Sequence, residues 1–165
     1  MSGRRFSTIV IMYTPQMYVA FTRNPDKARK KGPGAPVWWR IIGGRERDEL
    51  SVKETPEQTA TREAKEESGK ILEKDDLFLV AIINKGDHDL HVFSSPVDTL
   101  DDIRPEPSKI GVEVKSISLD YVASHQSEFH RDHIGYLVRA GLIKKSSVEK
   151  TQISPAPQKA LACVG

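Results

Sequence analysis

One helix, predicted over residues 56–68, constrains this chain most strongly because complete start and stop signals frame it. Thr55 is a favourable N-cap, Pro56 suits the first helical position, and Gln58 can complete a capping box. Gly69 supplies the left-handed residue that commonly ends a helix. We therefore predict a helix of roughly three to four turns.

The acidic residues of this helix gather on one face. At about 100° per residue, Glu63, Glu66 and Glu67 lie within roughly 100° of arc. Glu63 and Glu67 form a like-charge pair one turn apart, which weakens an isolated helix by a few tenths of a kcal/mol. Converging carboxylates raise one another's pKa unless a cation neutralises them, and incompletely coordinated oxygen ligands suit Mg²⁺ or Mn²⁺. The face therefore predicts a site for a divalent metal.

A solvated, salt-bridged helix is the alternative interpretation of the same face. Glu66 and Lys70 have the favourable i,i+4 orientation, and Arg62 and Glu66 have the weaker reverse one. Helix chemistry alone leaves the metal site and the salt-bridged face equally open.

The spacing of the fixed residues resembles a known family motif. Glu54, seven further residues and the run REAKEESG at residues 62–69 resemble the Nudix box, written G-x5-E-x7-R-E-U-x-E-E-x-G-U with U an aliphatic residue. Ala64 is a small residue at a U position, and Gly43-Gly44 fits the Gly-Gly pair that typically precedes the box. On these residues the chain resembles the Nudix hydrolase superfamily.

Two features depart from the motif. Nine residues separate Gly44 from Glu54 where the family has five, so we expect an inserted stretch within residues 45–53. Lys70 stands at the final aliphatic position, and the aliphatic Ile71 follows it. The first departure bears on Gly44, whose backbone carbonyl the family usually offers to the metal.

The resemblance implies an α/β fold, namely a Nudix-type α/β/α sandwich around a mixed β-sheet. It also implies metal-dependent hydrolysis of the diphosphate linkage of a nucleoside diphosphate joined to a further group, with Mg²⁺ or Mn²⁺ as cofactor. The residues that would hold the metal are Glu63, Glu66, Glu67 and Gly44. Glu63 would act as ligand or general base, and Arg62 would orient the box carboxylates, Glu54 included. Gly69 completes the box as a structural residue.

Glu113 is a second candidate for the general base. Many relatives draw a further carboxylate from a strand or loop well after the box, and Glu113 opens a predicted strand that precedes a helix. An exposed strand carboxylate with no catalytic role is the equally favoured alternative.

The remaining predicted elements suit a mixed sheet between helices. Apolar and β-branched runs predict strands at residues 6–13, 17–22, 37–42, 77–84, 90–94 and 111–119. The nearly continuous apolar run at 77–84 predicts a central strand buried on both faces. Helical periodicity predicts a second long helix over 128–140, covering the sheet opposite the box helix. His130 and His133 share a face of it, but two histidines without a third ligand are a weak zinc signal.

Basic and aromatic residues before the box are candidates for binding substrate. Residues 23–34 predict a loop with five Lys or Arg side chains, which could attract the phosphates of a nucleotide or of RNA, although a solvated loop is the favoured interpretation. Trp38 and Trp39 point to opposite faces of a strand, so at most one can line a site and stack on a base. Core packing is the favoured role for each singly. We take Trp39, Arg40 and Arg23 as the substrate-binding candidates.

Composition sets wider bounds. The 165 residues, 38% hydrophobic and 29% charged, are typical of one folded domain. We expect a Nudix hydrolase domain over residues 1–145 and a flexible tail over 146–165, which is rich in Lys, Ser, Gln and Pro. The net charge of +2 is too small to indicate nucleic acid or a membrane as the main partner, and no apolar run approaches the ~20 residues of a membrane span. The single cysteine, Cys163, excludes an internal disulfide and agrees with a cytoplasmic location.

The substrate is the least determined feature. The family's signatures for ADP-ribose, diadenosine polyphosphates or coenzyme A are not evident in this sequence, and Asn84 stands where ADP-ribose-type relatives tend to carry Pro. A nucleoside triphosphate is therefore the leading class, with the triphosphate end of an RNA as an alternative. Two further interpretations are a catalytically silent Nudix-fold module that binds nucleotide or RNA, and an RNA-binding protein whose glutamates are structural. Because many relatives dimerise, the resemblance also allows a homodimer.

Overall fold

A mixed sheet organises the structure, a computed structural model that describes residues 3–47 and 53–145. Within these residues seven strands join in the order β3-β2-β1-β6-β5, with β4 paired to β1 and β7 paired to β2. Their bounds are β1 Phe6–Tyr13, β2 Tyr18–Arg23, β3 Arg40–Ile41, β4 Gly43–Arg45, β5 Phe78–Asn84, β6 Asp89–Pro96 and β7 Glu113–Ser118. The tail expected over 146–165, and residues 48–52 of the expected insertion, lie outside the described residues.

β1 is the central strand of this sheet. It runs parallel to β6 along its length and antiparallel to β2 and β4. Ile9 and Ile11 point into an apolar cluster on one face, and Val10 and Met12 point into a second cluster on the other. The strand is therefore buried on both faces.

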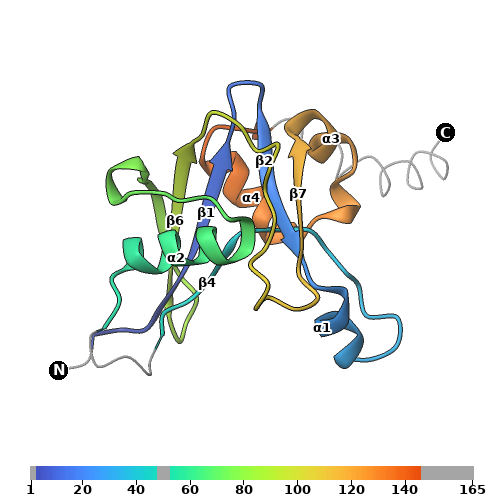
Figure 1. The fold of residues 1–165 in the computed structure, drawn as a ribbon, viewed down its shortest axis with the longest axis horizontal. Helices are drawn as coiled ribbons and strands as arrows, with labels where there is room; N and C mark the ends of the chain where they lie inside the picture. The colour runs from blue at the N-terminus through green and yellow to red at the C-terminus, as the bar shows by residue number, and fades with distance from the viewer. Residues whose placement is uncertain (1–2, 48–52, 146–165) are drawn as a thin grey trace, which may run out of the picture.

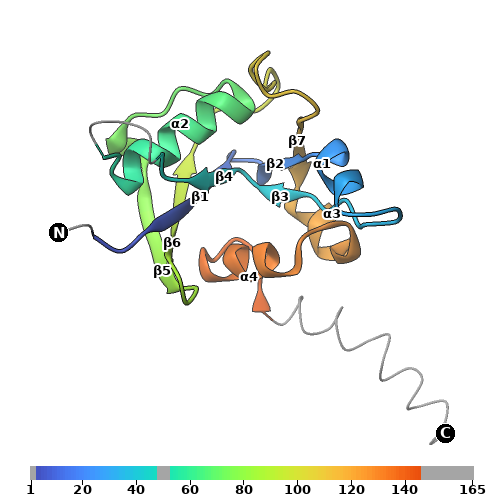
Figure 2. The ribbon, with the colours of Figure 1, turned by 90° about the horizontal axis from the view of Figure 1, so that it is seen from below.

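Helices cover both faces of the sheet, as Figures 1 and 2 show. The helices and short 3-10 turns are α1 Pro25–Lys30, α2 Pro56–Ser68, η1 Lys74–Asp76, α3 Leu119–Ser124, η2 Gln126–Glu128 and α4 Arg131–Arg139. Ala60 and Ala64 of α2 pack into the cluster that holds Val10. Val122 of α3 and Leu137 of α4 pack into the opposite cluster. The predicted α/β/α sandwich around a mixed sheet is confirmed.

The predicted box helix is present with the predicted caps. The Thr55 hydroxyl accepts a hydrogen bond from the Gln58 N–H at 3.2 Å, while the Gln58 side chain accepts one from the Thr55 N–H at 2.9 Å. Gly69 ends α2 in the left-handed region at φ 76°, and its N–H donates to the Lys65 carbonyl at 2.8 Å. These contacts satisfy backbone groups that a helix end would otherwise leave unpaired.

The strand predicted at 77–84 is not central, and that expectation was wrong. β5 lies at the end of the strand order and pairs with β6 alone among the described strands. The side chains of Phe78, Leu79 and Ile82 are 58%, 55% and 54% exposed. Apolar runs at 6–13 and 77–84 look alike in sequence, and only strand pairing decides which of them is covered on both faces.

Two predicted segments before the box also differ. The expected loop 23–34 contains α1, because the Asn24 side chain accepts the Lys27 N–H at 3.0 Å and Pro25 opens the helix. The expected strand 37–42 is reduced to β3. The Gly-Gly pair forms part of β4, since both glycines pair with β1.

Candidate active site

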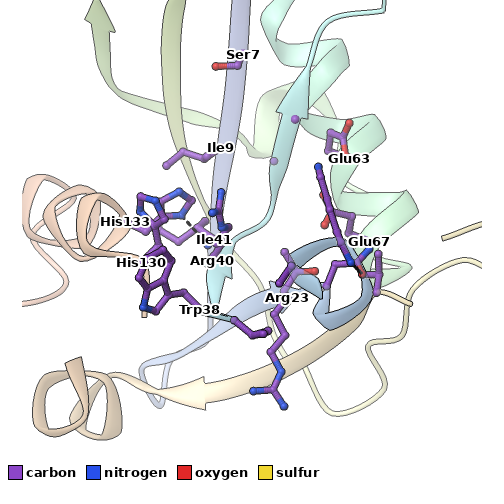
Figure 3. Close-up of a pocket in the computed structure, with 18 of the residues that line it drawn as sticks. Ser7, Ile9, Arg23, Trp38, Arg40, Ile41, Glu63, Glu67, His130 and His133 are labelled. Atoms are coloured by element: carbon purple, nitrogen blue, oxygen red, sulfur yellow. Dashed lines mark hydrogen bonds between the residues drawn. The ribbon is translucent and has the colours of Figure 1, made fainter. Parts of the chain in front are cut away.

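A cavity of about 860 Å³ opens between α2 on one side and α4 on the other, with β4 and β3 at its base. Figure 3 shows Glu63 and Glu67 on one wall, and Trp38, His130 and His133 on the facing wall. This volume lies in the range of small-molecule sites. The pocket therefore brings part of the predicted box face together with residues that lie more than sixty positions later in the chain.

Glu63 and Glu67 are buried carboxylates, 6% and 8% exposed, on the sheet-facing side of α2. Small residues along the same side of the helix let it approach the sheet closely. Gly44 is essential to this packing, because a Cβ there would lie 2.3 Å from Oε1 of Glu63. At Gly43 a Cβ would meet the Thr8 carbonyl oxygen at 2.1 Å. Gly44 thus makes room for the first carboxylate of α2, and Gly43 makes room for the neighbouring strand β1.

The surroundings of Glu67 perturb its pKa. Burial is the main cause that raises the pKa of Glu67 to about 8, and the neighbouring Glu63 carboxyl adds to it. The Lys109 ammonium and the Thr22 hydroxyl act in the opposite direction. Glu67 therefore holds less negative charge near neutral pH than an exposed glutamate would, and a cation placed beside it would favour its charged form.

Glu66 lies among basic side chains, two of which also contact Glu63. Its carboxylate lies 2.5 Å from the guanidinium of Arg47, 3.3 Å from that of Arg62 and 3.2 Å from Nζ of Lys109. The side chain is 12% exposed. The salt-bridged interpretation therefore holds for Glu66 and also for Glu63, which pairs with Arg62 and Lys109. Glu63 and Glu67 line the pocket, and the metal site stays a prediction.

Arg62 and Glu54 form the paired core of the box. Arg62 donates to both oxygens of Glu54, at 2.7 and 2.9 Å, and also to Glu63 at 2.9 Å. The hydrogen bond from Arg62 is the largest of the causes that lower the pKa of Glu54 to about 2. The same contact raises the pKa of Arg62, against the opposing effect of burial. The pairing of Arg62 with Glu54 therefore has the geometry that the resemblance implies.

Lys109 was not singled out from the sequence. It lies in the loop before β7, which two hydrogen bonds dock onto the end of α2: Glu106 N–H donates to the Glu66 carbonyl at 2.8 Å and Arg104 N–H to the Ser68 carbonyl at 3.0 Å. Burial alone would lower the pKa of Lys109, but the surrounding carboxylates raise it above its ordinary value. A lone lysine in an irregular loop carries no periodicity or motif, so no sequence signal marks it.

The substrate-binding candidates fall in different places. Arg23 and Arg40 line the pocket. Trp39 is 7% exposed within the apolar core, and the Arg23 guanidinium carbon lies 4.2 Å from the centre of its ring. The tryptophan that lines the pocket is Trp38, which corrects the choice between the two. The alternation of strand side chains allowed one of them to face the site, but only the tertiary structure shows which.

Glu113 is placed at the start of β7, opposite Arg23 of β2. Its carboxylate accepts a hydrogen bond from Arg23 at 2.5 Å, and its side chain is 48% exposed. It is not among the described residues that line the pocket.

Carboxylate oxygens are the donors that a hard divalent cation prefers, so the chemistry of the box face fits Mg²⁺ or Mn²⁺. Among residues 3–47 and 53–145, however, no three His, Cys, Asp or Glu side chains converge as they stand into a ligand group for an ion. Glu63 and Glu67 already adjoin. Glu66 would have to exchange Arg47 and Lys109 for the ion.

A family model for the NUDIX domain matches residues 3–136, which is more than half of the chain. The chain belongs to the Nudix family. The resemblance drawn from the box residues is therefore confirmed. As a Nudix hydrolase, the protein is an enzyme that acts on pyrophosphate bonds, and Nudix hydrolases generally use divalent metals.

Solved structures of Nudix proteins share the fold at low sequence identity. A NUDIX-family hydrolase from Clostridium perfringens is 18% identical, with a TM-score of 0.60 over 87% of this chain and 100% of its own. The NUDIX domain of Shewanella oneidensis NrtR, solved with ADP ribose, is 16% identical, with a TM-score of 0.62 over 85% and 88%. A MutT from Aliivibrio salmonicida or Vibrio cholerae is 17% identical, with a TM-score of 0.54 over 74% and 86%.

A search of curated proteins found no match. In the part of the chain that the structure describes, no helix has the length and apolar character needed to cross a membrane.

Proposed function

We propose that this Nudix hydrolase cleaves the diphosphate linkage of a nucleoside diphosphate joined to a further group, with a nucleoside or deoxynucleoside triphosphate as the favoured substrate. Mg²⁺ or Mn²⁺ is the proposed cofactor. The observation that carries the proposal is the pair Glu63 and Glu67, two buried carboxylates that line one wall of a nucleotide-sized pocket. Glu63 is paired with Arg62 at 2.9 Å, whereas Glu67 makes no salt bridge to a described residue. A buried carboxylate without a paired cation is costly unless it holds a proton or a metal.

The proposed metal ligands are the carboxylates of Glu63, Glu66 and Glu67 and the backbone carbonyl of Gly44. When bound, a divalent ion would neutralise charge on the pyrophosphate and supply an activated water. Arg62 would keep Glu63 and Glu54 in place through its hydrogen bonds. Glu66 would join the ligand set by turning from its present basic partners.

Glu63 is our preferred general base over Glu113. Glu63 lines the pocket and contacts Glu67, whereas Glu113 is half exposed and bound to Arg23. A base must come within hydrogen-bond reach of the water whose proton it takes. We therefore expect Glu63→Gln to lower kcat by orders of magnitude and Glu113→Gln to lower it less than about tenfold.

Basic side chains around the pocket support a phosphate-rich substrate. They are Arg23, Lys27, Lys31, Arg40, Lys85 and Lys109. Their charge would stabilise a polyphosphate and the charge that develops on cleavage. Lys27 and Lys31 belong to α1 and its cap, so part of this basic lining comes from a different element than the carboxylates of α2. For that reason the triphosphate end of an RNA is the second candidate substrate.

The experiment is release of phosphate or pyrophosphate from a panel, with Mg²⁺, with Mn²⁺ and with a chelator. The panel holds nucleoside and deoxynucleoside triphosphates, oxidised deoxynucleotides, nucleotide sugars, ADP-ribose, dinucleoside polyphosphates and a 5′-triphosphorylated RNA. Metal-dependent turnover of a nucleotide is the expected result, and it should be lost in Glu67→Gln. Glu57→Gln, on the same helix but outside the pocket lining, is the matched control and should keep wild-type turnover.

If the wild-type protein hydrolysed no member of the panel, the proposal would be contradicted, and a Nudix-fold module that binds without turnover would be favoured. Binding of RNA that tightens steeply as salt falls, without hydrolysis, would favour the RNA-binding alternative.

We further propose a cytoplasmic location and a domain that spans residues 1–145. A homodimer is a separate proposal, which light scattering in solution would test directly. A monomer across the micromolar range would contradict the dimer without affecting the proposed reaction.

A further inference from the structure

The pocket wall that faces the carboxylates consists of rings. Trp38 meets His130 edge-on at 5.6 Å between ring centres, His130 meets His133 at 5.0 Å, and His133 meets Tyr136 at 5.3 Å. All four side chains line the same cavity as Glu63 and Glu67. Figure 3 shows Trp38, His130 and His133 across the cavity from the carboxylates.

His133 is held in this wall by the backbone of β3. Just before it, Trp39 N–H donates to the Glu128 carbonyl and His130 N–H donates to the Trp39 carbonyl, each at 2.9 Å. The two segments then separate because α4 begins. Two residues after Trp39, the Ile41 N–H donates to Nδ1 of His133 at 2.9 Å instead of to a backbone carbonyl. The imidazole thus takes the place of the backbone acceptor that is lost where α4 begins.

This contact fixes the chemistry of the free edge of the ring. Because Nδ1 accepts a hydrogen bond, a neutral imidazole must carry its proton on Nε2. Burial is the main cause that lowers the pKa of His133 to about 3, and the nearby His130 adds to it. The ring is therefore neutral at physiological pH. Among the described residues, no hydrogen bond joins Nε2 to a protein acceptor.

Trp38 provides an aromatic surface beside this donor. It is 38% exposed, which is large for an indole ring inside a cavity. Two basic side chains adjoin these rings: Lys85 donates to the Tyr136 hydroxyl at 3.2 Å, and Arg40 is near enough to lower the pKa of His133. The neutral rings themselves offer little to a phosphate, which favours such basic side chains. They offer a stacking face and a hydrogen bond to a flat group that carries an acceptor atom.

We propose that Trp38, His130 and His133 form a nucleobase subsite, in which the base stacks on Trp38 and accepts a hydrogen bond from Nε2 of His133. The inference rests on the proposed function, because it places the base opposite the carboxylates that would act on the phosphates. It commits the substrate to a nucleoside derivative rather than to a sugar or inorganic polyphosphate, which lack an aromatic face.

The test is binding without metal or turnover. Dissociation constants for a nucleoside 5′-monophosphate and for pyrophosphate are measured by calorimetry in the presence of a chelator. Trp38→Ala and His133→Asn should each weaken binding of the monophosphate by roughly tenfold and leave pyrophosphate unchanged. In His133→Asn the side-chain oxygen can still accept the Ile41 N–H, while the donor at the Nε2 position is lost. His125→Asn, which replaces an exposed histidine outside the pocket lining, is the control.

Imidazole ¹⁵N–¹H spectra of the wild-type protein give a second measurement that needs no variant. His133 should show a proton on Nε2 throughout pH 6–8, and its resonance should move with the nucleoside monophosphate but not with pyrophosphate. If the variants weakened binding of the monophosphate and of pyrophosphate equally, the effect would be structural and the subsite would be overturned. Unaltered binding of the monophosphate in the variants would also overturn it.

The inference and the proposed function fail separately. Binding of the monophosphate that depends on Trp38 and His133, in a protein that hydrolyses nothing in the panel, supports the subsite and contradicts the hydrolase. Hydrolysis of tripolyphosphate as fast as of a nucleoside triphosphate, unaffected by either substitution, supports the reaction and overturns the subsite.

Discussion

At the scale of single residues, Arg62 connects most parts of the box. Its guanidinium contacts both oxygens of Glu54, one oxygen each of Glu63 and Glu66, and the Arg45 carbonyl at 3.0 Å. The planar fork of arginine suits such a set of acceptors, whereas the compact ammonium of lysine cannot make both contacts to Glu54. Arg62 is therefore a positioning residue as well as a counter-charge.

Because of the Arg62–Glu54 pair, we predict that the free energy of unfolding falls as the pH is lowered. The pKa of Glu54 is about 2 in the folded protein, below the ordinary value of 4.5. The stabilisation from this pair is therefore fully present above pH 4.5 and is lost as the pH falls toward 2. Glu54→Gln should cost about 1–3 kcal/mol near neutral pH. It should also flatten the fall in unfolding free energy between pH 4.5 and 2, measured by urea denaturation. An unchanged pH profile would contradict this role.

We also predict, for a single residue, that the Lys109 ammonium competes with a divalent metal ion for the same carboxylates. Its Nζ lies 3.2 Å from Glu66 and 3.9 Å from Glu63, both of them proposed ligands. A divalent ion would have to displace this ammonium, so Lys109→Met should tighten Mn²⁺ binding by roughly fivefold to tenfold. Electron paramagnetic resonance of free Mn²⁺ measures this without substrate. Weaker Mn²⁺ binding in the variant would show that Lys109 supports the ligand arrangement rather than competing with the ion.

At the scale of elements, α2 and β4 form one unit through the closeness of their backbones. Thr59, Ala60, Ala64 and Ser68 give α2 a small-residue side, and Gly44 removes the side chain that would separate Glu63 from the strand. The fit of helix and strand therefore places the first carboxylate, even though nine residues separate Gly44 from Glu54.

Gly44→Ala tests that fit. The added Cβ would lie 2.3 Å from Oε1 of Glu63 and must displace it. We expect kcat to fall by on the order of a hundredfold, because small misplacements of catalytic groups are costly, with a loss of stability of about 1–3 kcal/mol. Gly135→Ala on α4 is the matched control. Its Cβ would meet nothing within 4 Å, and alanine favours the helix by ~0.5–1 kcal/mol. Wild-type activity in Gly44→Ala would contradict the proposed placement of Glu63.

At the scale of the whole molecule, the sheet has a fully covered centre and a half-open edge. β1 lies between β6 and β2, under helices on both faces, whereas β5 ends the order with large apolar side chains exposed. Such an edge tolerates substitution, and it is also the kind of surface on which sheets associate.

A pair of isoleucines distinguishes centre from edge. Ile11 of β1 is 0% exposed and Ile82 of β5 is 54% exposed. Ile11→Ala should cost about 2–5 kcal/mol of unfolding free energy, whereas Ile82→Ala should cost less than about 1 kcal/mol. Chemical denaturation measures both. A large loss in Ile82→Ala would mean that β5 is covered in solution, and light scattering would then show whether a second copy covers it.

The sequence by itself determined the features that depend on neighbours along the chain. The capping box at Thr55, the stop at Gly69 and the one-faced spacing of Glu63, Glu66 and Glu67 follow from contacts within a few residues. The motif carried by these residues was enough to predict the family and its fold. Helix α1 is an exception, because its N-cap at Asn24 is also local, yet the Pro, Gly and Lys residues of the segment 23–34 predicted a loop.

The tertiary structure alone decided what depends on residues distant in sequence. Apolar runs at 6–13 and 77–84 carry similar hydrophobic patterns, and strand pairing put the first at the centre and the second at the edge. The choice of Trp38 over Trp39 depended on how the segment before β3 packs, with Trp39 in the core and Trp38 in the pocket. Lys109 lies at the pocket because its loop is hydrogen-bonded to the end of α2. His133 lies there because its imidazole accepts the Ile41 N–H. No short-range pattern encodes such contacts, because they arise only when separate elements pack together.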